Sequence, residues 1–334
     1  MGERVKTRMI HRLSSQRMNQ VLDDSCGLKF PAPPVTPRPV KNAFILGAGL
    51  GNRLRPLTER LPKPLVPLFH RPLAEWAMEA CAKAGISRFA VNTHHLAAAW
   101  DGFGSGDDLT LFNEPILLET GGGLKNIEGW MGGDAVLVHN GDIFSTLPLK
   151  KLIAAHEASG LPVTLAVRSE GVAKHIALDA SSARVSDIRN SLGRGEGTHT
   201  FTGIYCVNPA FLELIPAGEK ISVIPAFLEL AESGRLGAIV LDEGVWLDLG
   251  DRESYLKAHR ELGLGPAIHP LALIAEGATV ERSVVGPGAI VEKGAIVRDS
   301  VLWPDSKVAE GAILERCIVF SSVPATGFLQ DVDI

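Results

Sequence analysis

This sequence lacks several features that mark specialised classes of protein. Its four cysteines, Cys26, Cys81, Cys206 and Cys317, are scattered and form no C-x-x-C pair. Their spacing argues against a disulfide framework or a zinc site and fits a reducing cytoplasm. No apolar run approaches the length that crosses a bilayer, and the N-terminal residues lack the apolar core of a signal peptide. We therefore expect a cytoplasmic protein with no membrane association.

An excess of positive charge is also missing. The chain carries 33 Lys and Arg against 38 Asp and Glu, a net charge of -5, which argues against general nucleic-acid binding. Any nucleotide would then be bound at a site and not on a basic face. The 334 residues, 46% hydrophobic and 21% charged, are typical of a globular protein with two domains, or with one large and one small domain.

Residues 1–40 have no sustained hydrophobic period. They end in a proline-rich stretch, Phe30–Pro39, so we predict a disordered or loosely docked extension. A start codon assigned too early explains the segment equally well, because Met9 and Met18 lie downstream.

The most informative stretch begins with the apolar run Ala43–Leu46, which is followed by Gly47-Ala48-Gly49-Leu50-Gly51-Asn52-Arg53. An apolar run that breaks into alternating glycines predicts a buried strand leading into a sharply turning loop. Loops of this kind turn backbone N–H groups toward an anion, and Arg53, Arg55 and Lys63 add positive charge nearby. We interpret the loop as a phosphate-binding site, although a simple strand-to-helix turn has the same composition.

Two common phosphate-binding loops do not match. The loop lacks the Gly-Lys-Ser/Thr of nucleoside triphosphatases, and its glycines at 47, 49 and 51 miss the G-x-G-x-x-G spacing of dinucleotide-binding folds. The stretch instead resembles the opening motif of the nucleotidyl transferase family: a glycine loop with Arg, then Pro56-Leu57-Thr58, then Pro62-Lys63-Pro64. Asn52 stands where that family usually has Thr or Ser.

The elements that follow predict an α/β domain over residues 41–262. Apolar positions recur at helical spacing over 73–84, and strands are expected at 88–92, 109–112 and 135–139. Residues 119–124 are expected to precede a short helix ending at Trp130. This order implies parallel crossovers, and hence a Rossmann-like mixed, mostly parallel sheet flanked by helices, with ligands at the carboxyl ends of its strands.

Two aspartates are candidate metal ligands. Asp142 ends Asn140-Gly141-Asp142 directly after the strand 135–139, where it could coordinate a hard cation or simply belong to a turn. Asp248 lies in Trp246-Leu247-Asp248-Leu249-Gly250-Asp251, which resembles the family's Trp-x-Asp-x-Gly-Thr. Asp251 then replaces Thr and is expected to cap the next helix. If Asp248 and Asp251 are both only helix caps, Asp248 does not bind metal.

The C-terminal part contains an internal repeat. Residues 280–296 align without gaps on 297–313, and a third copy starts at Leu314. Apolar residues step by five or six, which resembles the hexapeptide repeats of left-handed β-helices. We predict a short left-handed β-helix over 263–325. Because so short a solenoid buries little apolar surface, it should pack on the catalytic domain or on a neighbouring subunit, giving a homo-oligomer.

The family resemblance implies Mg²⁺-dependent transfer of a nucleotidyl group from a nucleoside triphosphate to a sugar 1-phosphate. It places Arg53 at the leaving pyrophosphate and Lys63 at the phosphates near the reacting centre. It makes Asp142 and Asp248 the magnesium ligands. It assigns nucleotide contacts to Gly47, Ala48, Gly49, Gly51, Glu119, Gly122 and Asn140, and sugar-phosphate contacts to Thr202 and Gly203.

The identity of the base and of the sugar stays open. Glu119–Gly123 most resembles the corresponding segment of uridylyltransferases that act on N-acetylmuramate 1-phosphate, whereas an appended β-helix is typical of mannose-1-phosphate guanylyltransferases. We favour uridylyl transfer. A non-catalytic nucleotide-sugar-binding relative would be expected to have lost Arg53, Lys63 or an aspartate, and none is lost. An acyltransferase role for the β-helix is disfavoured by its few repeats.

Overall fold

A computed structural model describes residues 39–104 and 108–334. The predicted extension, residues 1–40, lies outside the described residues except for its last two positions. In the described part no helix has the length and apolar character needed to span a membrane. The α-helices are α2 (Leu73–Lys83), α3 (Glu119–Asn126), α4 (Glu128–Met131), α5 (Leu149–Ser159), α6 (Ile224–Glu232) and α7 (Arg252–Glu261). The 3-10 helices are η1 (Asn52–Leu54), η2 (Leu57–Glu59), η3 (Lys63–Leu65), η4 (Ala97–Trp100) and η5 (Pro209–Leu214).

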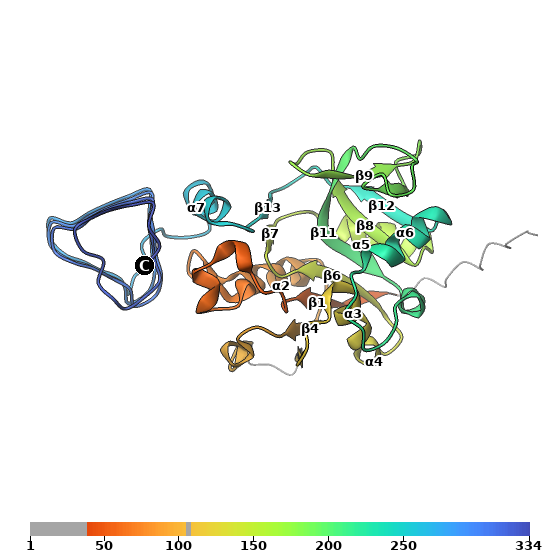
Figure 1. Ribbon diagram of the computed structural model, residues 1–334, viewed down its shortest axis with the longest axis horizontal. Coiled ribbons are helices and arrows are strands. Elements are labelled where there is room, and N and C mark those ends of the chain that lie inside the picture. The colour runs from red at the N-terminus through yellow and green to blue at the C-terminus, as the bar shows by residue number, and fades with distance from the viewer. Residues whose placement is uncertain (1–38, 105–107) are drawn as a thin grey trace, which may run out of the picture. The chain divides into compact units, whose positions relative to one another are not determined.

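A nine-stranded mixed sheet forms the centre of the first domain (Figure 1). Its strands are β1 (Val40–Leu46), β4 (Arg88–Thr93), β5 (Leu109–Asn113), β6 (Ala135–Asn140), β8 (Val163–Arg168), β9 (Lys174–Leu178), β10 (Val185–Ile188), β11 (His199–Val207) and β12 (Leu236–Val240). Strands β5, β4, β1 and β6 are parallel neighbours, and β11 runs antiparallel to β6 and β8. The predicted α/β fold and the expected strands at 88–92, 109–112 and 135–139 are confirmed.

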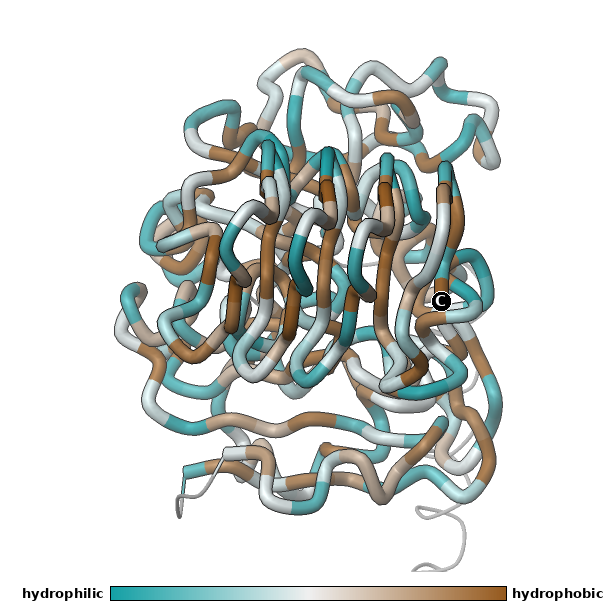
Figure 2. Tube along the Cα trace, turned by 90° about the vertical axis from the view of Figure 1, so that its left-hand side faces the viewer, coloured by the Kyte–Doolittle hydropathy of each residue, from teal (hydrophilic) through white to brown (hydrophobic). Residues whose placement is uncertain are grey.

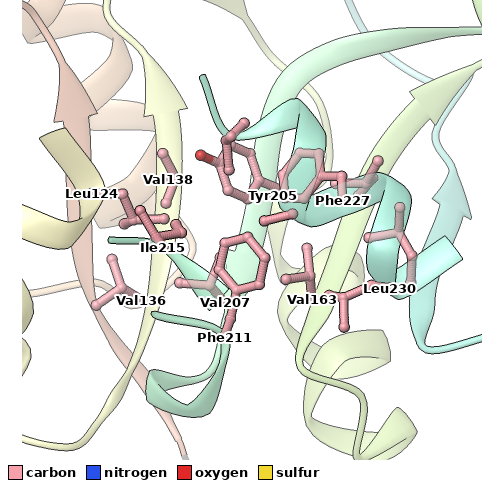
Figure 3. Close-up of a cluster of buried hydrophobic side chains, with 14 of the residues drawn as sticks. Leu124, Val136, Val138, Val163, Tyr205, Val207, Phe211, Ile215, Phe227 and Leu230 are labelled. Atoms are coloured by element: carbon pink, nitrogen blue, oxygen red, sulfur yellow. The ribbon is translucent and has the colours of Figure 1, made fainter. Parts of the chain in front are cut away.

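Helices cover both faces of this sheet. Successive strand side chains point to opposite faces, so Phe44 of β1 joins one core while Ala43 and Ile45 join the other. The first core packs under α3, α4 and α6, and Figure 3 shows its strand valines against aromatic rings of the covering segments. The second core packs under α2 and α5. The sheet is therefore buried on both sides, and its strand ends are the places left for a ligand.

Small antiparallel pairs complete this domain. Strands β2 (Pro67–Leu68) and β3 (Arg71–Pro72) form one pair, and β7 (Ile143–Ser145) and β13 (Trp246–Asp248) form another. Helix α7 then begins with the expected cap, because Asp251 accepts a hydrogen bond from the Ser254 N–H within a capping box.

The C-terminal domain is a parallel β-helix with a triangular cross-section (Figure 1). Its strands are β14 (Leu273–Ile274), β15 (Thr279–Glu281), β16 (Val284–Val285), β17 (Ile290–Val291), β18 (Ile296–Arg298), β19 (Val301–Leu302), β20 (Lys307–Val308), β21 (Ile313–Glu315), β22 (Ile318–Val319) and β23 (Phe328–Gln330). They form three flat sheets with the strand orders β14-β17-β20, β15-β18-β21-β23 and β16-β19-β22. The coil thus extends past residue 325.

The coil repeats every 17 residues, as the gapless alignment of 280–296 on 297–313 predicts. Val280 pairs with Val297, and Val297 pairs with Leu314. Figure 2 shows the hydrophobic segments of successive coils aligned beside one another. Glycines at equivalent corners, Gly277, Gly294 and Gly311, have φ of +77°, +68° and +68°. This conformation is open to glycine without strain, which is why the corners repeat that residue.

Candidate active site

A cavity of about 510 Å³ lies at the carboxyl ends of the parallel strands. Its lining contains most of the residues that the sequence predicted, together with several that it did not. The lining residues are Leu46, Ala48, Gly49, Gly51, Asn52, Arg53, Lys63, Pro64, Asn92, Leu117, Glu119, Thr120, Asn140, Asp142, Ser222 and Gly250. This volume suits a small-molecule ligand.

Strand pairing brings the two separate motifs to the cavity. Strands β1 and β6 are in parallel register, with Leu46 opposite Asn140, and the Gly141 N–H donates to the Leu46 carbonyl at 3.0 Å. The glycine loop and the Asn140-Gly141-Asp142 turn therefore leave the sheet side by side. This is the expected result of two parallel strands that end at one edge.

A second strand pair brings in Asp248. Strand β13 pairs antiparallel with β7, so that Asp248 lies opposite Ile143, the residue after Asp142. The Leu249 N–H also donates to the Asp142 carbonyl at 3.4 Å. Two aspartates that are distant in sequence are thus neighbours because of one short antiparallel pair.

Two cations and two carboxylates converge at this edge. Lys63 Nζ lies 2.7 Å from Asp142 Oδ2 and 4.0 Å from Asp248 Oδ1, and Arg53 Nη2 lies 3.9 Å from Asp248 Oδ2. The Lys63 side chain is 7% exposed, whereas that of Arg53 is 69% exposed. Lys63 is therefore fixed in the wall, and Arg53 is free to turn toward a bound anion.

The two carboxylates repel each other. Burial raises the pKa of Asp248 above its usual value, and the Asp142 charge raises it further, while Lys63 and Arg53 act in the opposite direction. Partial removal from water and a like charge both disfavour the ionised form. A divalent cation beside both carboxylates would relieve this repulsion.

The residues present fit a divalent ion such as Mg²⁺. This hard cation takes oxygen ligands and is usually held by one or two carboxylates plus substrate phosphates. Asp142 lines the cavity, and Asp248, which does not line it, lies beside the lining residues Arg53 and Lys63. No group of three or more His, Cys, Asp or Glu side chains suited to a metal occurs in the described residues. An ion here would therefore take its remaining ligands from phosphate oxygens or water.

The glycine loop presents only part of its backbone to the cavity. Ala48, Gly49 and Gly51 line it, but the Gly47 N–H donates to Asn92 Oδ1 at 2.7 Å. A Cβ at Gly47 would lie 2.6 Å from the Asn92 carbonyl oxygen. The Gly47 N–H is thus used to anchor the loop to β4, which corrects the expectation that it points at a phosphate.

Asn92 and Glu114 form a buried network that sequence reasoning missed. Asn92 Nδ2 donates to Glu114 Oε1 at 2.7 Å, and the Leu118 N–H donates to Glu114 Oε2 at 3.0 Å. Both side chains are almost fully buried. Through them the glycine loop and the start of α3 are held to one carboxylate. Each residue lies at or just after the end of a parallel strand, the same signal that identified Asp142.

The segment Glu119–Gly123 is helical, contrary to the expectation that it precedes a helix. Helix α3 begins at Glu119, and the Gly121 and Gly122 N–H groups donate to the Ile221 carbonyl. A Cβ on Gly122 would lie 2.3 Å from the Glu219 carbonyl oxygen. Gly122 is therefore buried against the segment 219–222 instead of lining the cavity, while Glu119 and Thr120 do line it.

Thr202, which was predicted to contact the sugar phosphate, uses its hydroxyl for hydrogen bonds within the protein. Its hydroxyl donates to the Ala166 carbonyl at 2.8 Å and accepts from the Ile204 N–H, so it is not available to a ligand. Gly203 has φ +72°, and a Cβ there would lie 2.6 Å from Asn140 Nδ2. Gly203 thus makes room for Asn140, which lines the cavity.

Two protein-family models match this chain, one over each domain. A family model described as nucleotidyl transferase matches residues 42–263, and one described as GlmU-like, C-terminal hexapeptide matches residues 268–326. The second match identifies the β-helix as the predicted left-handed hexapeptide type.

Two curated relatives differ in the reaction that their names state. A mannose-1-phosphate guanylyltransferase of Mycobacterium tuberculosis is 28% identical over 278 residues, which is 74% of this chain and 77% of that protein. An N-acetylmuramate alpha-1-phosphate uridylyltransferase of Neisseria meningitidis is 30% identical over 224 residues, which is 62% of this chain and 92% of that protein.

A solved structure shares the fold. The UDP-glucose pyrophosphorylase from Acinetobacter baumanii superposes with a TM-score of 0.57 at 19% identity, covering 66% of this chain and 92% of that one. This likeness shows a shared fold.

Proposed function

Since this chain belongs to the nucleotidyl transferase family and is a sugar-1-phosphate nucleotidyltransferase, we propose that its chemistry takes place between Arg53, Lys63, Asp142 and Asp248. The observation that carries this proposal is the convergence of these four charged groups, three of which line one cavity. The catalysed step joins a nucleoside triphosphate to a sugar 1-phosphate and releases pyrophosphate.

In this step an oxygen of the sugar phosphate attacks the α-phosphorus in line. A new P–O bond forms, the bond to the α,β-bridging oxygen breaks, and its electron pair leaves with pyrophosphate. Because two polyanions must meet and negative charge develops on the leaving oxygen, positioning and cationic stabilisation supply most of the catalysis.

The charged side chains have distinct places in this scheme. The exposed Arg53 turns to the leaving pyrophosphate, and the buried Lys63 lies beside the phosphates at the reacting centre. Two prolines, Pro62 and Pro64, restrict the backbone that carries Lys63. Ala48, Gly49 and Gly51 line the cavity, and we assign their backbone N–H groups to the triphosphate.

Asp142 and Asp248 would hold the divalent ion, for which we propose Mg²⁺. When bound, such an ion supplies positive charge against phosphate oxygens. The Lys63 ammonium lies within ion-pair distance of both carboxylates and offsets their repulsion.

We propose uridylyl transfer to N-acetylmuramate 1-phosphate as the first substrate pair. The support is the Glu119–Gly123 segment, whose first two residues line the cavity, together with the relative of that name, which aligns over 92% of its own length. Asn140 lines the cavity and is the candidate for a nucleotide contact.

Guanylyl transfer to mannose 1-phosphate is the second candidate, and one observation favours it. The relative of that activity aligns over 278 residues, more than the matched catalytic domain at 42–263 contains. The similarity therefore extends beyond the matched catalytic domain, covering 74% of this chain against 62% for the uridylyltransferase.

A pyrophosphate-release screen separates the two. The four nucleoside triphosphates are each tested with N-acetylmuramate, mannose and glucose 1-phosphates in the presence of Mg²⁺, and Asp142→Asn prepared in parallel reports contaminating activity. The highest kcat/KM with UTP and N-acetylmuramate 1-phosphate supports the first pair, and the highest with GTP and mannose 1-phosphate supports the second. No release above the Asp142→Asn blank with any pair would contradict the proposed site.

A further inference from the structure

The segment 51–66, which carries Arg53 and Lys63, has little secondary structure to hold it. It contains only the 3-10 helices η1, η2 and η3, each of three residues. Turns this short make few backbone hydrogen bonds and do not persist without side-chain packing. Its apolar residues Leu54, Leu57 and Val66 are nevertheless at most 1% exposed.

These side chains are buried against the β-helix. Leu54, Leu57 and Val66 share one apolar cluster with residues of α7 and with Val301, Trp303 and Ile318 of the β-helix. Leu54 directly follows Arg53 in the chain. The loop that presents the active-site arginine therefore uses the C-terminal domain as part of its own core.

The β-helix face involved is apolar on its outer side. In β19 and β22, Leu302 and Val319 point into the coil interior. Side chains alternate along a strand, so their neighbours Val301 and Ile318 point outward, and these two are paired in register. Outward positions of a solenoid normally face water, yet these are 3% and 0% exposed.

Hydrogen bonds tie the same face to the far end of the loop. Trp303 Nε1 donates to the Tyr255 hydroxyl at 3.0 Å, and that hydroxyl donates to the Pro67 carbonyl at 2.6 Å. Arg60 Nη1 donates to the Phe320 carbonyl at 2.5 Å. The β-helix thus holds the segment 51–66 at two places. One is Arg60, near its middle, and the other is Pro67, just past its end, which is held through Tyr255.

We infer that this outer face of the β-helix is a positioning element of the active site, and that Trp303 is a positioning residue. It acts through Leu54 and Tyr255 on the backbone that aims Arg53 and Lys63. The inference rests on the proposed function of those two residues. Displacing catalytic groups by about 1 Å lowers rates by about 100-fold, so loss of this packing should lower kcat more than it raises KM.

The test compares Trp303→Ala with Leu314→Ala. Leu314 is fully buried in the coil interior, within the β-helix core cluster and away from the cluster that contains Leu54. Both variants lose a large buried side chain, so both should unfold at a lower temperature. We expect kcat for pyrophosphate release, measured well below both melting temperatures, to fall about 10- to 100-fold in Trp303→Ala and to stay near wild type in Leu314→Ala.

Two further variants complete the test. Trp303→Phe keeps an aromatic ring in the cluster and loses only the bond to Tyr255, so it should recover most of kcat. Should Trp303→Ala not fold, Ile318→Val removes one methyl group from the same cluster and should give a smaller fall in kcat with KM unchanged. Equal kcat for Trp303→Ala and Leu314→Ala, in an active wild-type enzyme, would overturn the inference alone. An inactive wild type would instead contradict the proposed function.

Discussion

The Lys63 ammonium lies 2.7 Å from the Asp142 carboxylate, inside a protein wall where the lysine side chain is only 7% exposed. The two residues come from separate motifs, one from the glycine-loop segment and one from the end of β6. Their contact fixes these two charges relative to each other. Groups fixed in this way need little reorganisation during reaction, which is the condition for effective charge stabilisation.

Removing the charge of Arg53 should impair chemistry without unfolding the protein. Its side chain is 69% exposed, so Arg53→Ala should leave the melting temperature unchanged. We expect kcat/KM to fall by the equivalent of about 2 to 4 kcal/mol of transition-state stabilisation. Arg55→Ala removes an exposed arginine two residues away on the same loop and is the matched control. Equal activity of the two variants would refute the role of Arg53.

Glu114→Gln should affect both stability and nucleotide binding. The Glu114 carboxylate accepts from Asn92 and from the Leu118 N–H, and an amide would turn its NH₂ group toward one of these donors. A buried donor left without an acceptor costs about 1 to 3 kcal/mol. Urea denaturation should show this loss, and KM for the nucleoside triphosphate should rise because the glycine loop loses its anchor. An unchanged KM would mean that the network serves folding only.

Replacement of two helical glycines by alanine should change the free energy of unfolding in opposite directions. A Cβ at Gly122 would lie 2.3 Å from the Glu219 carbonyl oxygen, whereas one at Gly129 meets nothing within 4 Å. Gly122→Ala should therefore lower the free energy of unfolding by about 1 to 3 kcal/mol through overpacking. Gly129→Ala should raise it by about 0.5 to 1 kcal/mol, the helix preference of alanine over glycine. Denaturation midpoints of the two variants measure both signs, and a stable Gly122→Ala protein would contradict the packing role.

Stability should fall in mild acid. Burial lowers the pKa of His139, His156 and His259 to about 4 from 6.5. The unfolded chain therefore takes up protons between pH 6.5 and 4 that the folded protein excludes. The contribution of these histidines to stability is complete above pH 6.5 and is lost progressively as the pH falls from 6.5 through 4. Each histidine contributes a loss on the order of 3 kcal/mol when complete.

Urea midpoints measured at pH 7.5, 6 and 5 test this expectation. They should decrease in that order. His259→Gln, which does not titrate, should show a flatter dependence than wild type even though it is less stable at pH 7.5. Midpoints that stay constant between pH 7.5 and 5 would contradict the account of these histidines.

The local sequence pattern predicted those parts of the fold that depend on residues close together in the sequence. The apolar runs that became β1, β4 and β6, the cap at Asp251 and the 17-residue coil period were all readable from the sequence. Asp142 and the glycine loop could be placed together because parallel strands end at one edge. The small buried area of the β-helix predicted packing on the catalytic domain or on a neighbouring subunit, and the structure shows packing on the catalytic domain.

The parts of the fold and of the site that could not be predicted depend on contacts between segments distant in sequence. Nothing near Gly47 in sequence indicates that its N–H is taken by Asn92. The glycines of α3 were expected to precede a helix, because the segment 219–222 that packs against them is distant in sequence. The outward residues Val301 and Ile318 fit the repeat equally well whether they face water or a partner domain. Such contacts are set by tertiary packing, which overrides local preference.

The most direct test of the central claim is a double-mutant cycle on Asp142 and Asp248. Pyrophosphate release at saturating substrate and Mg²⁺ is measured for wild type, Asp142→Asn, Asp248→Asn and the double variant. If both carboxylates hold one cation, either single change removes most of its effect, so the double variant should be little slower than the slower single variant. Losses in rate that simply multiply would show that the two aspartates act independently and would contradict the account.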